Sequence, residues 1–322
     1  MTYARIVGTG SYLPEKVLSN AEIAERIDTS DEWIVARTGI RARHIAAGQE
    51  KTSDLALAAS QRAIAAAGID KADIDLIIVA TSTPDMIFPS TACVLQDKLG
   101  VPGCPAFDVQ AVCAGFIYAL STANAYIRSG MARTALVVGA EIFSRILDWK
   151  DRGTCVLFGD GAGAAVIEAG GDSPLAVELS TAPDVETLHV PGLVGTSPFK
   201  ASADSKSVLS MNGRRVFKFG VNAICDTVHK LAIDAGILVE DIDHFVFHQA
   251  NERILSQAVK RLGVPDERVV RTLRETGNIS SACIPLALDR LANAGALHTG
   301  DTIALVGFGA GLDIGGYLLR WK

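Results

Sequence analysis

The sequence predicts an α/β protein built from two similar halves, and three observations lead to this fold class. Hydrophobic residues make up 49% of the 322 residues and charged residues only 20%, which is typical of a compact protein with a large core. A chain of this length exceeds what one hydrophobic core usually supports. Two stretches of the chain also repeat each other. We expect one half over residues 1–171 and the second over residues 172–322.

The repeat keeps a constant offset and alternates helical patterns with short apolar runs. The stretch from Gly68 to Val79 resembles that from Gly236 to Phe247, and a strand-like run that ends at Gly139 recurs at Gly307. Each pair of glycines is 168 residues apart. Chance reuse of turn sequences does not explain an offset that is kept across separate segments, so each copy is predicted to be one α/β unit.

Composition excludes several classes of protein. A net charge of −6 argues against a general binder of nucleic acid or anionic membranes. The uncharged stretch 109–127 contains polar residues, which favours a buried helix over a membrane span. The N-terminus lacks the pattern of a signal peptide. We therefore expect a cytoplasmic protein without a membrane segment.

The cysteines show neither metal-site nor disulfide spacing. Six are present, and no two stand in a C-x-x-C arrangement, so we expect no metal site and a reducing compartment. Five of them lie in apolar or helical contexts and are predicted to be core residues: Cys93, Cys104, Cys155, Cys225 and Cys283.

Cys113 lies where a strand-like apolar run meets a helical pattern that begins near Phe116. Its thiol is thus predicted to lie at a strand-to-helix elbow. Backbone N–H groups at a helix N-terminus favour an anion, so we expect a lowered pKa for this thiol and a nucleophilic thiolate. The alternative is a buried apolar cysteine, since free cysteine is among the most buried residue types.

Two polar residues of the second half are predicted to approach Cys113. His248 ends an apolar strand, and Asn278 precedes a helix start at Ser281, the residue that the repeat offset pairs with Cys113. If the halves pack about a pseudo-twofold axis, their strand ends converge on one crevice. Histidine is a common general acid or base, and an asparagine amide can polarise a carbonyl without ionising. Alternatively, each is structural, as a hydrogen-bonded histidine and a turn asparagine.

Two glycine-containing loops have different interpretations. The loop 308–312 follows a strand, and its backbone N–H groups could approach a substrate oxygen closely, although a plain turn is the alternative. The loop 159–163 lacks the residues of a P-loop and the spacing of a dinucleotide-binding loop, so a structural turn is expected.

The motifs, taken together, resemble those of β-ketoacyl-acyl-carrier-protein synthase III along essentially the whole chain. They are the flank of Cys113, His248–Asn251, Gly277-Asn278, Thr29–Trp33 with Arg37–Arg41, and Asp151–Ala164. The resemblance implies a five-layered, internally duplicated αβαβα fold of the thiolase type, a homodimer and the initiation of fatty acid synthesis.

The resemblance also implies a mechanism without metal or cofactor. Cys113 would take an acyl group from acetyl-CoA or another short acyl-CoA as a thioester. After malonyl-acyl carrier protein binds, His248 and Asn278 would stabilise the enolate formed by decarboxylation, which attacks that thioester. The backbone N–H groups of Cys113 and Ala310 would bind the oxyanion.

Further residues match binding positions of the family. Trp33 and Arg152 would stack on the CoA adenine, with Thr29 nearby and Arg37 near the pyrophosphate. The acyl pocket would contain Leu157 and Phe88, the latter reaching across the dimer. The basic residues that would dock the carrier protein are Lys218, Arg253, Lys260 and Arg261. The alternatives are a capped surface helix with ordinary ion pairs, core packing for Phe88 and a solvated helix face.

Three positions depart from the family pattern. Ile279 stands where threonine is usual, Ala310 replaces the central glycine of a three-glycine loop, and Leu312–Gly315 replaces Phe-Thr-Trp-Gly. They leave open a specialised paralogue, or a polyketide-type or signal-type condensing enzyme, that uses a different acyl-CoA. An inactive scaffold of the same fold is the non-enzymatic alternative. Degradative thiolases are disfavoured because the loop 308–311 contains no cysteine.

Overall fold

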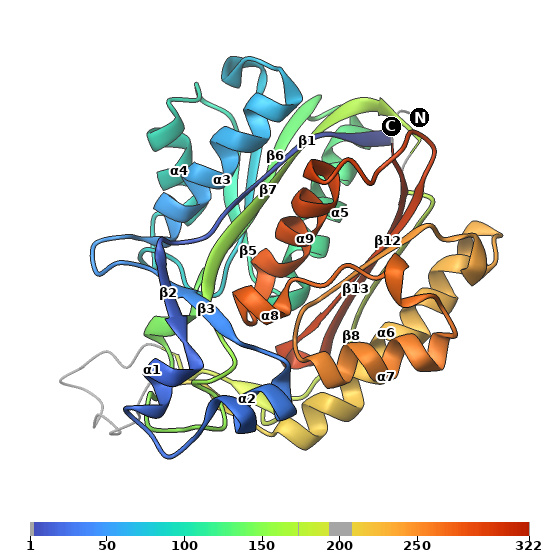
Figure 1. Cartoon of the computed structure of the whole chain (residues 1–322). Coiled ribbons are helices and arrows are strands. Elements are labelled where there is room, and N and C mark those ends of the chain that lie inside the picture. Colours follow the sequence, from blue (N-terminus) through green and yellow to red (C-terminus); the bar gives the residue numbers. More distant parts are fainter. Residues whose placement is uncertain (1–2, 173, 193–207, 322) are drawn as a thin grey trace.

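The computed structural model describes residues 3–172, 174–192 and 208–321, and its main feature is a pair of stacked β-sheets (Figure 1). The first sheet has the order β1-β7-β6-β4-β5 and the second the order β11-β12-β13-β8. In the first sheet the strands are β1 (Tyr3–Tyr12), β4 (Leu76–Ala80), β5 (Ala106–Val109), β6 (Thr134–Ile142) and β7 (Asp160–Gly171). In the second they are β8 (Ala176–Thr181), β11 (His244–Phe247), β12 (Thr302–Gly309) and β13 (Asp313–Arg320).

Helices cover both sheets and fill the space between them (Figure 1). Outside the first sheet lie α3 (Thr52–Ala67) and α4 (Thr91–Leu99); α5 (Gly115–Ser129) and α9 (Cys283–Asn293) lie between the sheets; α6 (Gly213–Ala235) and α7 (Glu252–Leu262) lie outside the second. Both α5 and α9 contact strands of each sheet. The predicted five-layered α/β architecture is therefore confirmed.

The two sheets show the repeat that the sequence predicts. The strands β4 and β11 start 168 residues apart, as do β6 and β12 and the helices α5 and α9. In both halves two parallel strands are followed by an antiparallel one. Where β5 pairs with β4, the second half has only an isolated bridge between Phe245 and Val269.

Smaller elements lie below the sheets in Figure 1, near the ends of the strands that carry the site. These elements are β2 (Lys16–Ser19), β3 (Ala42–Ile45), β9 (Leu188–His189), β10 (Ser210–Met211), α1 (Asn20–Ala24), α2 (Asp31–Thr38) and α8 (Leu273–Thr276). The α2 helix is capped by Ser30, whose hydroxyl accepts a hydrogen bond from the Trp33 N–H at 3.1 Å, and it ends at Gly39 with φ of 80°. These local contacts fix the helix that carries Trp33 and Arg37.

Each half contains a sharp elbow, just before its central helix, that lies against a glycine of the opposite half. The elbows are two short 3₁₀ helices, Val112–Ala114 and Ser280–Ala282. A Cβ on Gly307 would lie 3.0 Å from Cα of Ala114, and a Cβ on Gly139 would overlap the carbonyl oxygen of Ser281. The residues that start the elbows, Val112 and Ser280, have φ of 44° and 50°, a strained region for such side chains.

The cysteine prediction is wrong at one position. Cys155, Cys225 and Cys283 are buried as expected, but Cys93 is exposed and Cys104 is half-buried. Cys93 is the third residue of α4, in the first turn of the helix. In the described part of the chain no helix is long and apolar enough to cross a membrane.

Replacing Gly139 by alanine tests the contact between the elbow and the strand. Because the new Cβ would collide with backbone, we expect the free energy of unfolding to fall by about 1–3 kcal/mol, measured by urea denaturation, with loss of condensation activity. Gly48→Ala is the matched control, since a Cβ there meets nothing within 4 Å. Equal stability of the two variants would contradict the packing argument.

Candidate active site

One cavity of about 740 Å³ gathers the three residues predicted to carry the chemistry. Cys113 enters it from the first half, and His248 and Asn278 enter it from the second. Ala310 also lines the cavity, as does Leu157. The convergence predicted from the repeat is therefore present in the structure.

Cys113 is buried, with 4% of its surface exposed. It lies in the first elbow, and its thiol donates a hydrogen bond to the Ser280 hydroxyl at 3.4 Å. Burial raises the pKa of this thiol to about 12; the hydrogen bond with Ser280 opposes the rise and the nearby Glu141 carboxylate adds to it. The expected lowering of the pKa by a helix N-terminus is wrong, because loss of hydration outweighs the helix dipole here.

His248 follows β11 and is almost fully buried. Its backbone N–H donates to the Val306 carbonyl at 2.8 Å, and the edge-to-face contact with Phe308 has a centroid distance of 5.2 Å. Burial lowers the pKa of the imidazole to about 3, so the ring is neutral at pH 7. A neutral imidazole has one N–H and is suited to donate a hydrogen bond to a developing oxyanion.

Asn278 has its amide oriented by the second elbow. Its Oδ1 accepts a hydrogen bond from the Ser280 N–H at 2.8 Å, which assigns the oxygen and nitrogen positions. The backbone is fixed by a hydrogen bond from its N–H to the Leu157 carbonyl at 2.9 Å and by one from the Gly159 N–H to its carbonyl at 3.0 Å. The Nδ2 group has no partner among the described residues, so it remains available to a ligand.

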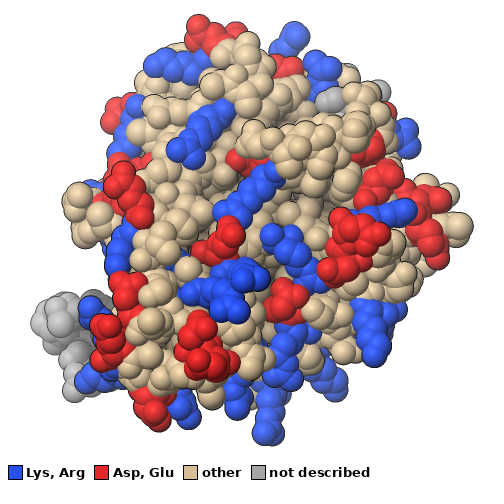
Figure 2. Space-filling model, viewed as in Figure 1, with Lys and Arg blue, Asp and Glu red and all other residues tan. Residues whose placement is uncertain are grey.

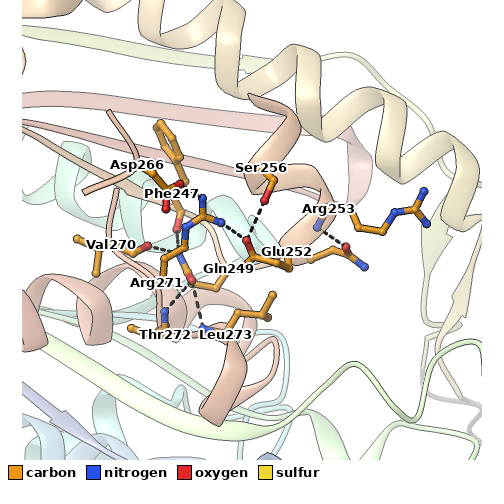
Figure 3. Close-up of polar contacts among 11 residues, drawn as sticks. Phe247, Gln249, Glu252, Arg253, Ser256, Asp266, Val270, Arg271, Thr272 and Leu273 are labelled. Atoms are coloured by element: carbon orange, nitrogen blue, oxygen red, sulfur yellow. Dashed lines mark hydrogen bonds and ion pairs between the residues drawn. The ribbon is translucent and has the colours of Figure 1, made fainter. Parts of the chain in front are cut away.

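Gln249 ties the histidine loop to the segment that leads to Asn278 (Figure 3). Its Nε2 donates to the carbonyls of Phe247 at 2.8 Å and Val270 at 3.1 Å. Its Oε1 accepts from the N–H groups of Thr272 at 2.9 Å and Leu273 at 3.2 Å. The buried amide thus satisfies four backbone groups at once and holds His248 and Asn278 in a fixed relation.

The end of β12 packs directly on the elbow that contains Cys113. A Cβ on Gly309 would lie 2.8 Å from the backbone nitrogen of Cys113, so only glycine allows this approach. The next backbone N–H group belongs to Ala310, and alanine has this donor just as glycine does. The departure from a three-glycine loop therefore leaves the backbone donor in place.

The predicted CoA residues cluster around Trp33. The guanidinium carbons of Arg37 and Arg152 lie 4.7 Å and 5.1 Å from the indole centroid. Arg37 also lines the cavity, whereas Thr29, Trp33 and Arg152 are not among its lining residues. The gap between Trp33 and Arg152 is too small for a purine, which needs about 7 Å for two stacking contacts. The hydroxyl of Thr29 is buried without a partner in the described chain.

Phe88 is not a core residue, which corrects the alternative of core packing beside Pro89. Its side chain is 82% exposed, and the neighbouring Ile87 is 71% exposed. An exposed pair of large apolar side chains on one loop is characteristic of a contact surface.

The four predicted docking residues are exposed on the two outer helices of the second half. Lys218 lies on α6, and Arg253, Lys260 and Arg261 lie on α7. Figure 2 shows basic side chains over the region of α2, α6 and α7, with acidic side chains among them. Arg253 also lines the cavity, while Arg261 is partly engaged by Asn222 at 2.7 Å.

Two polar residues of the site were not predicted from the sequence. Glu141 and Ser280 are both fully buried, and the Ser280 hydroxyl donates to Glu141 Oε1 at 3.2 Å. The sequence contained one signal for this pair, a glutamate near the end of the mostly apolar strand β6.

Two layered α/β halves that bring a cysteine, a histidine and an asparagine to one cavity define a condensing enzyme of the thiolase class. Family models named 3-oxoacyl-[acyl-carrier-protein (ACP)] synthase III and its C-terminal part match residues 107–183 and 233–321. The chain belongs to the β-ketoacyl-acyl-carrier-protein synthase III family. It is an acyltransferase that initiates fatty acid synthesis by a condensation reaction.

Individual relatives agree with this assignment. The beta-ketoacyl-[acyl-carrier-protein] synthase III of Neisseria meningitidis serogroup B is 53% identical over 325 residues, and the match covers all of both chains. The crystal structure of 3-oxoacyl-[acyl-carrier-protein] synthase III from Aquifex aeolicus has a TM-score of 0.92 at 40% identity, over 99% of this chain and 100% of that one. A priming β-ketosynthase from a polyketide biosynthetic pathway has a TM-score of 0.91 at 39% identity, over 99% and 96%.

Replacing Gln249 by leucine tests the link between the segments that carry His248 and Asn278. Two buried carbonyls and two buried N–H groups would lose their partner, so we expect the free energy of unfolding to fall by at least about 3 kcal/mol. Condensation should be lost as well. Gln257→Leu, on the exposed face of α7, is the control, and a Gln249→Leu variant as stable and active as this control would contradict the role.

Proposed function

We propose that Cys113 is the nucleophile that carries the acyl group as a thioester. The observation that supports this role best is the close approach of Gly309 to the Cys113 backbone nitrogen, because it favours a pair of donors formed by the N–H groups of Cys113 and Ala310. Such a pair suits the oxyanion of a tetrahedral intermediate. The acyl group is transferred from acyl-CoA, with CoA as the leaving group.

His248 and Asn278 then act on the second substrate, malonyl-acyl carrier protein. Loss of carbon dioxide from a malonyl thioester leaves an enolate, whose oxygen needs donors that do not give up a proton. The neutral His248 ring and the oriented Asn278 amide are two such donors. The carbanion attacks the acyl-Cys113 carbonyl, and the product is a β-ketoacyl thioester of the carrier protein. This sequence needs neither a metal nor an organic cofactor.

CoA would bind at the cavity mouth through Trp33, Arg37, Arg152 and Thr29. Arg152 must move away from the indole to admit the adenine. Its guanidinium donates to the Asp28 carbonyl at 2.9 Å and to the Asp28 carboxylate at 3.4 Å, and both contacts are exposed. Arg37 contacts the Trp33 ring and also lines the cavity, and a guanidinium there suits a pyrophosphate. The unpartnered Thr29 hydroxyl adds a polar contact.

The acyl pocket is proposed to be completed by a second copy of the chain. Leu157 lines the cavity from its own protomer. The exposed Phe88 loop would reach across a homodimer to the neighbouring pocket, which would bury the two large apolar side chains at its tip. The cytoplasm is the compartment proposed for the reaction, because a reducing environment keeps Cys113 as a free thiol.

A second candidate function is the priming of a polyketide pathway. It is favoured by the similarity to the priming β-ketosynthase and by the departures at Ile279 and Ala310. A panel of acyl-CoA primers, each assayed with malonyl-carrier protein and with malonyl-CoA, separates the two. A preference for acetyl-CoA with the carrier-protein extender supports fatty acid initiation, and a preference for a longer or branched primer supports the second function.

The nucleophile is tested by mass spectrometry of the intact protein after incubation with acetyl-CoA and a panel of longer acyl-CoA thioesters. We expect one acyl adduct, on the peptide that contains Cys113, and none in Cys113→Ala. His248→Ala should still acquire the adduct but should lose condensation by at least about 100-fold. An adduct on another residue, or acylation lost in His248→Ala, would contradict the assigned roles.

The carrier-protein surface is tested by charge reversal. Lys218→Glu combined with Lys260→Glu should raise the KM for malonyl-acyl carrier protein by about tenfold and weaken its salt dependence, because steering of an acidic partner is lost. Acylation by acyl-CoA should be unchanged. Lys51→Glu, which precedes α3 on the other side of the molecule, is the control, and equal effects of the two changes would contradict a local docking site.

A further inference from the structure

Glu141 is a buried carboxyl group for which the mechanism above has no use. It has no exposed surface, and it forms no ion pair with a described basic residue. Its Oε2 accepts hydrogen bonds from the Thr83 hydroxyl at 2.7 Å and the Ser82 N–H at 3.0 Å. Its Oε1 accepts from the hydroxyls of Ser281 at 2.9 Å and Ser280 at 3.2 Å. Buried carboxyl groups without a cation are costly, so this one calls for a reason.

The hydroxyl of Ser280 connects this carboxyl group to the Cys113 thiol. The chain of contacts is Sγ to Ser280 Oγ at 3.4 Å and Ser280 Oγ to Glu141 Oε1 at 3.2 Å. A hydroxyl can accept one proton and donate another at the same time. The backbone of Ser280 is held in place, since its φ is 50° and its N–H is bonded to Asn278, so the Cβ that carries the hydroxyl has a fixed position.

The Cys113 thiol needs a group that can accept its proton. With a pKa of about 12, only about one thiol in 10⁵ is ionised at pH 7, and the thiol itself is a poor nucleophile. His248 is a weak base, since its pKa is about 3. Among the described residues, the side-chain group that hydrogen-bonds to the Cys113 thiol is the Ser280 hydroxyl, which also bonds to Glu141, so the geometry offers this pair as the route for the proton.

We propose that Glu141 accepts the Cys113 proton through Ser280 during acylation and returns it after condensation. The proposal rests on the role of Cys113 as nucleophile. In the first step the thiol proton moves to Ser280 Oγ while the Ser280 proton moves to Glu141 Oε1. The thiolate forms a bond to the acyl carbon, the bond from that carbon to the CoA sulfur breaks, and the CoA thiolate takes a proton from water.

The return step balances the cycle. When the carbanion attacks the acyl-enzyme, the bond between the acyl carbon and Cys113 Sγ breaks and the sulfur leaves as a thiolate. The Glu141 proton then passes back through Ser280 to this sulfur. The carboxyl group thus ends the cycle in the ionised form in which it started.

Glu141 is suited to both steps at neutral pH. Burial raises its pKa to about 7, opposed by the hydrogen bonds from Thr83, Ser82, Ser281 and Ser280. The titratable groups that face it in the described structure are the thiols of Cys113 and Cys283. Because the ionised form accepts the proton, acylation should rise as the pH increases through about 7 and then level off.

The test is the single-turnover rate of Cys113 acylation by acetyl-CoA between pH 5 and 10, followed by mass spectrometry. Ser280→Ala should acylate about 100-fold more slowly at pH 7, and its rate should keep rising with pH because the thiol then ionises directly. Alanine should fit at this position, since the equivalent residue Val112 has a similar φ. Glu141→Gln should behave in the same way.

Ser281→Ala is the matched control, because its hydroxyl contacts the same carboxylate oxygen but not Cys113. It should retain the inflection near pH 7. The proposal is overturned if Ser280→Ala acylates within threefold of wild type with the inflection kept, or if Ser281→Ala loses it equally. If Glu141→Gln does not fold, Ser280→Ala alone decides. A wild-type protein that gains no adduct on Cys113 would instead overturn the proposed function.

Discussion

The structure depends on two equivalent contacts. In each of them, the elbow of one half packs against a glycine in a strand of the other half. Gly307 admits the backbone of the Cys113 elbow, and Gly139 admits the backbone of the Ser281 elbow. A side chain at either position would separate the halves. Because close packing transmits such shifts, the distances from Cys113 to Ser280 and to the loop at Gly309 depend on the same contact. The site therefore forms where these two equivalent contacts of the duplicated fold meet.

Burial at this junction sets the protonation of every group in the site. It keeps His248 neutral, it makes the Cys113 thiol hard to ionise, and it brings the pKa of Glu141 to about 7. A neutral His248 suits the role of hydrogen-bond donor to an enolate, and the exclusion of water protects a thioester. A Cys113 thiol that is hard to ionise would be a poor nucleophile if it had no route for its proton. The hydroxyl and carboxyl groups behind it provide one within the same buried network.

Much of this arrangement could be predicted from the sequence. The constant offset gave the two halves, the paired strands and the meeting of Cys113 with His248 and Asn278, because a repeat fixes topology before any distance is known. The pKa of Cys113 could not be predicted correctly, since a motif shows the helix that follows a thiol but not how much water surrounds it. Glu141 was missed because its partners come from two segments far apart in the chain, Thr81–Thr83 and Ser280-Ser281.

The conformation of the CoA residues was also beyond the sequence. The order of the motifs predicted that Trp33 and Arg152 lie together. It did not predict the short distance between them, which excludes a purine in this structure. Similarly, the pattern around Phe88 did not distinguish a core residue from one exposed for a partner. In both cases the proposed role involves a second molecule, whose contacts a single chain does not encode in its own packing.

The central claim is that the two halves create one acyl-transfer site around Cys113. The most direct measurement is a crystal structure of the protein after reaction with an acyl-CoA. We predict electron density continuous with Cys113 Sγ, and a thioester oxygen about 2.7–3.1 Å from the N–H groups of Cys113 and Ala310. A thioester oxygen directed away from both groups, or an acyl group attached to another residue, would contradict the account.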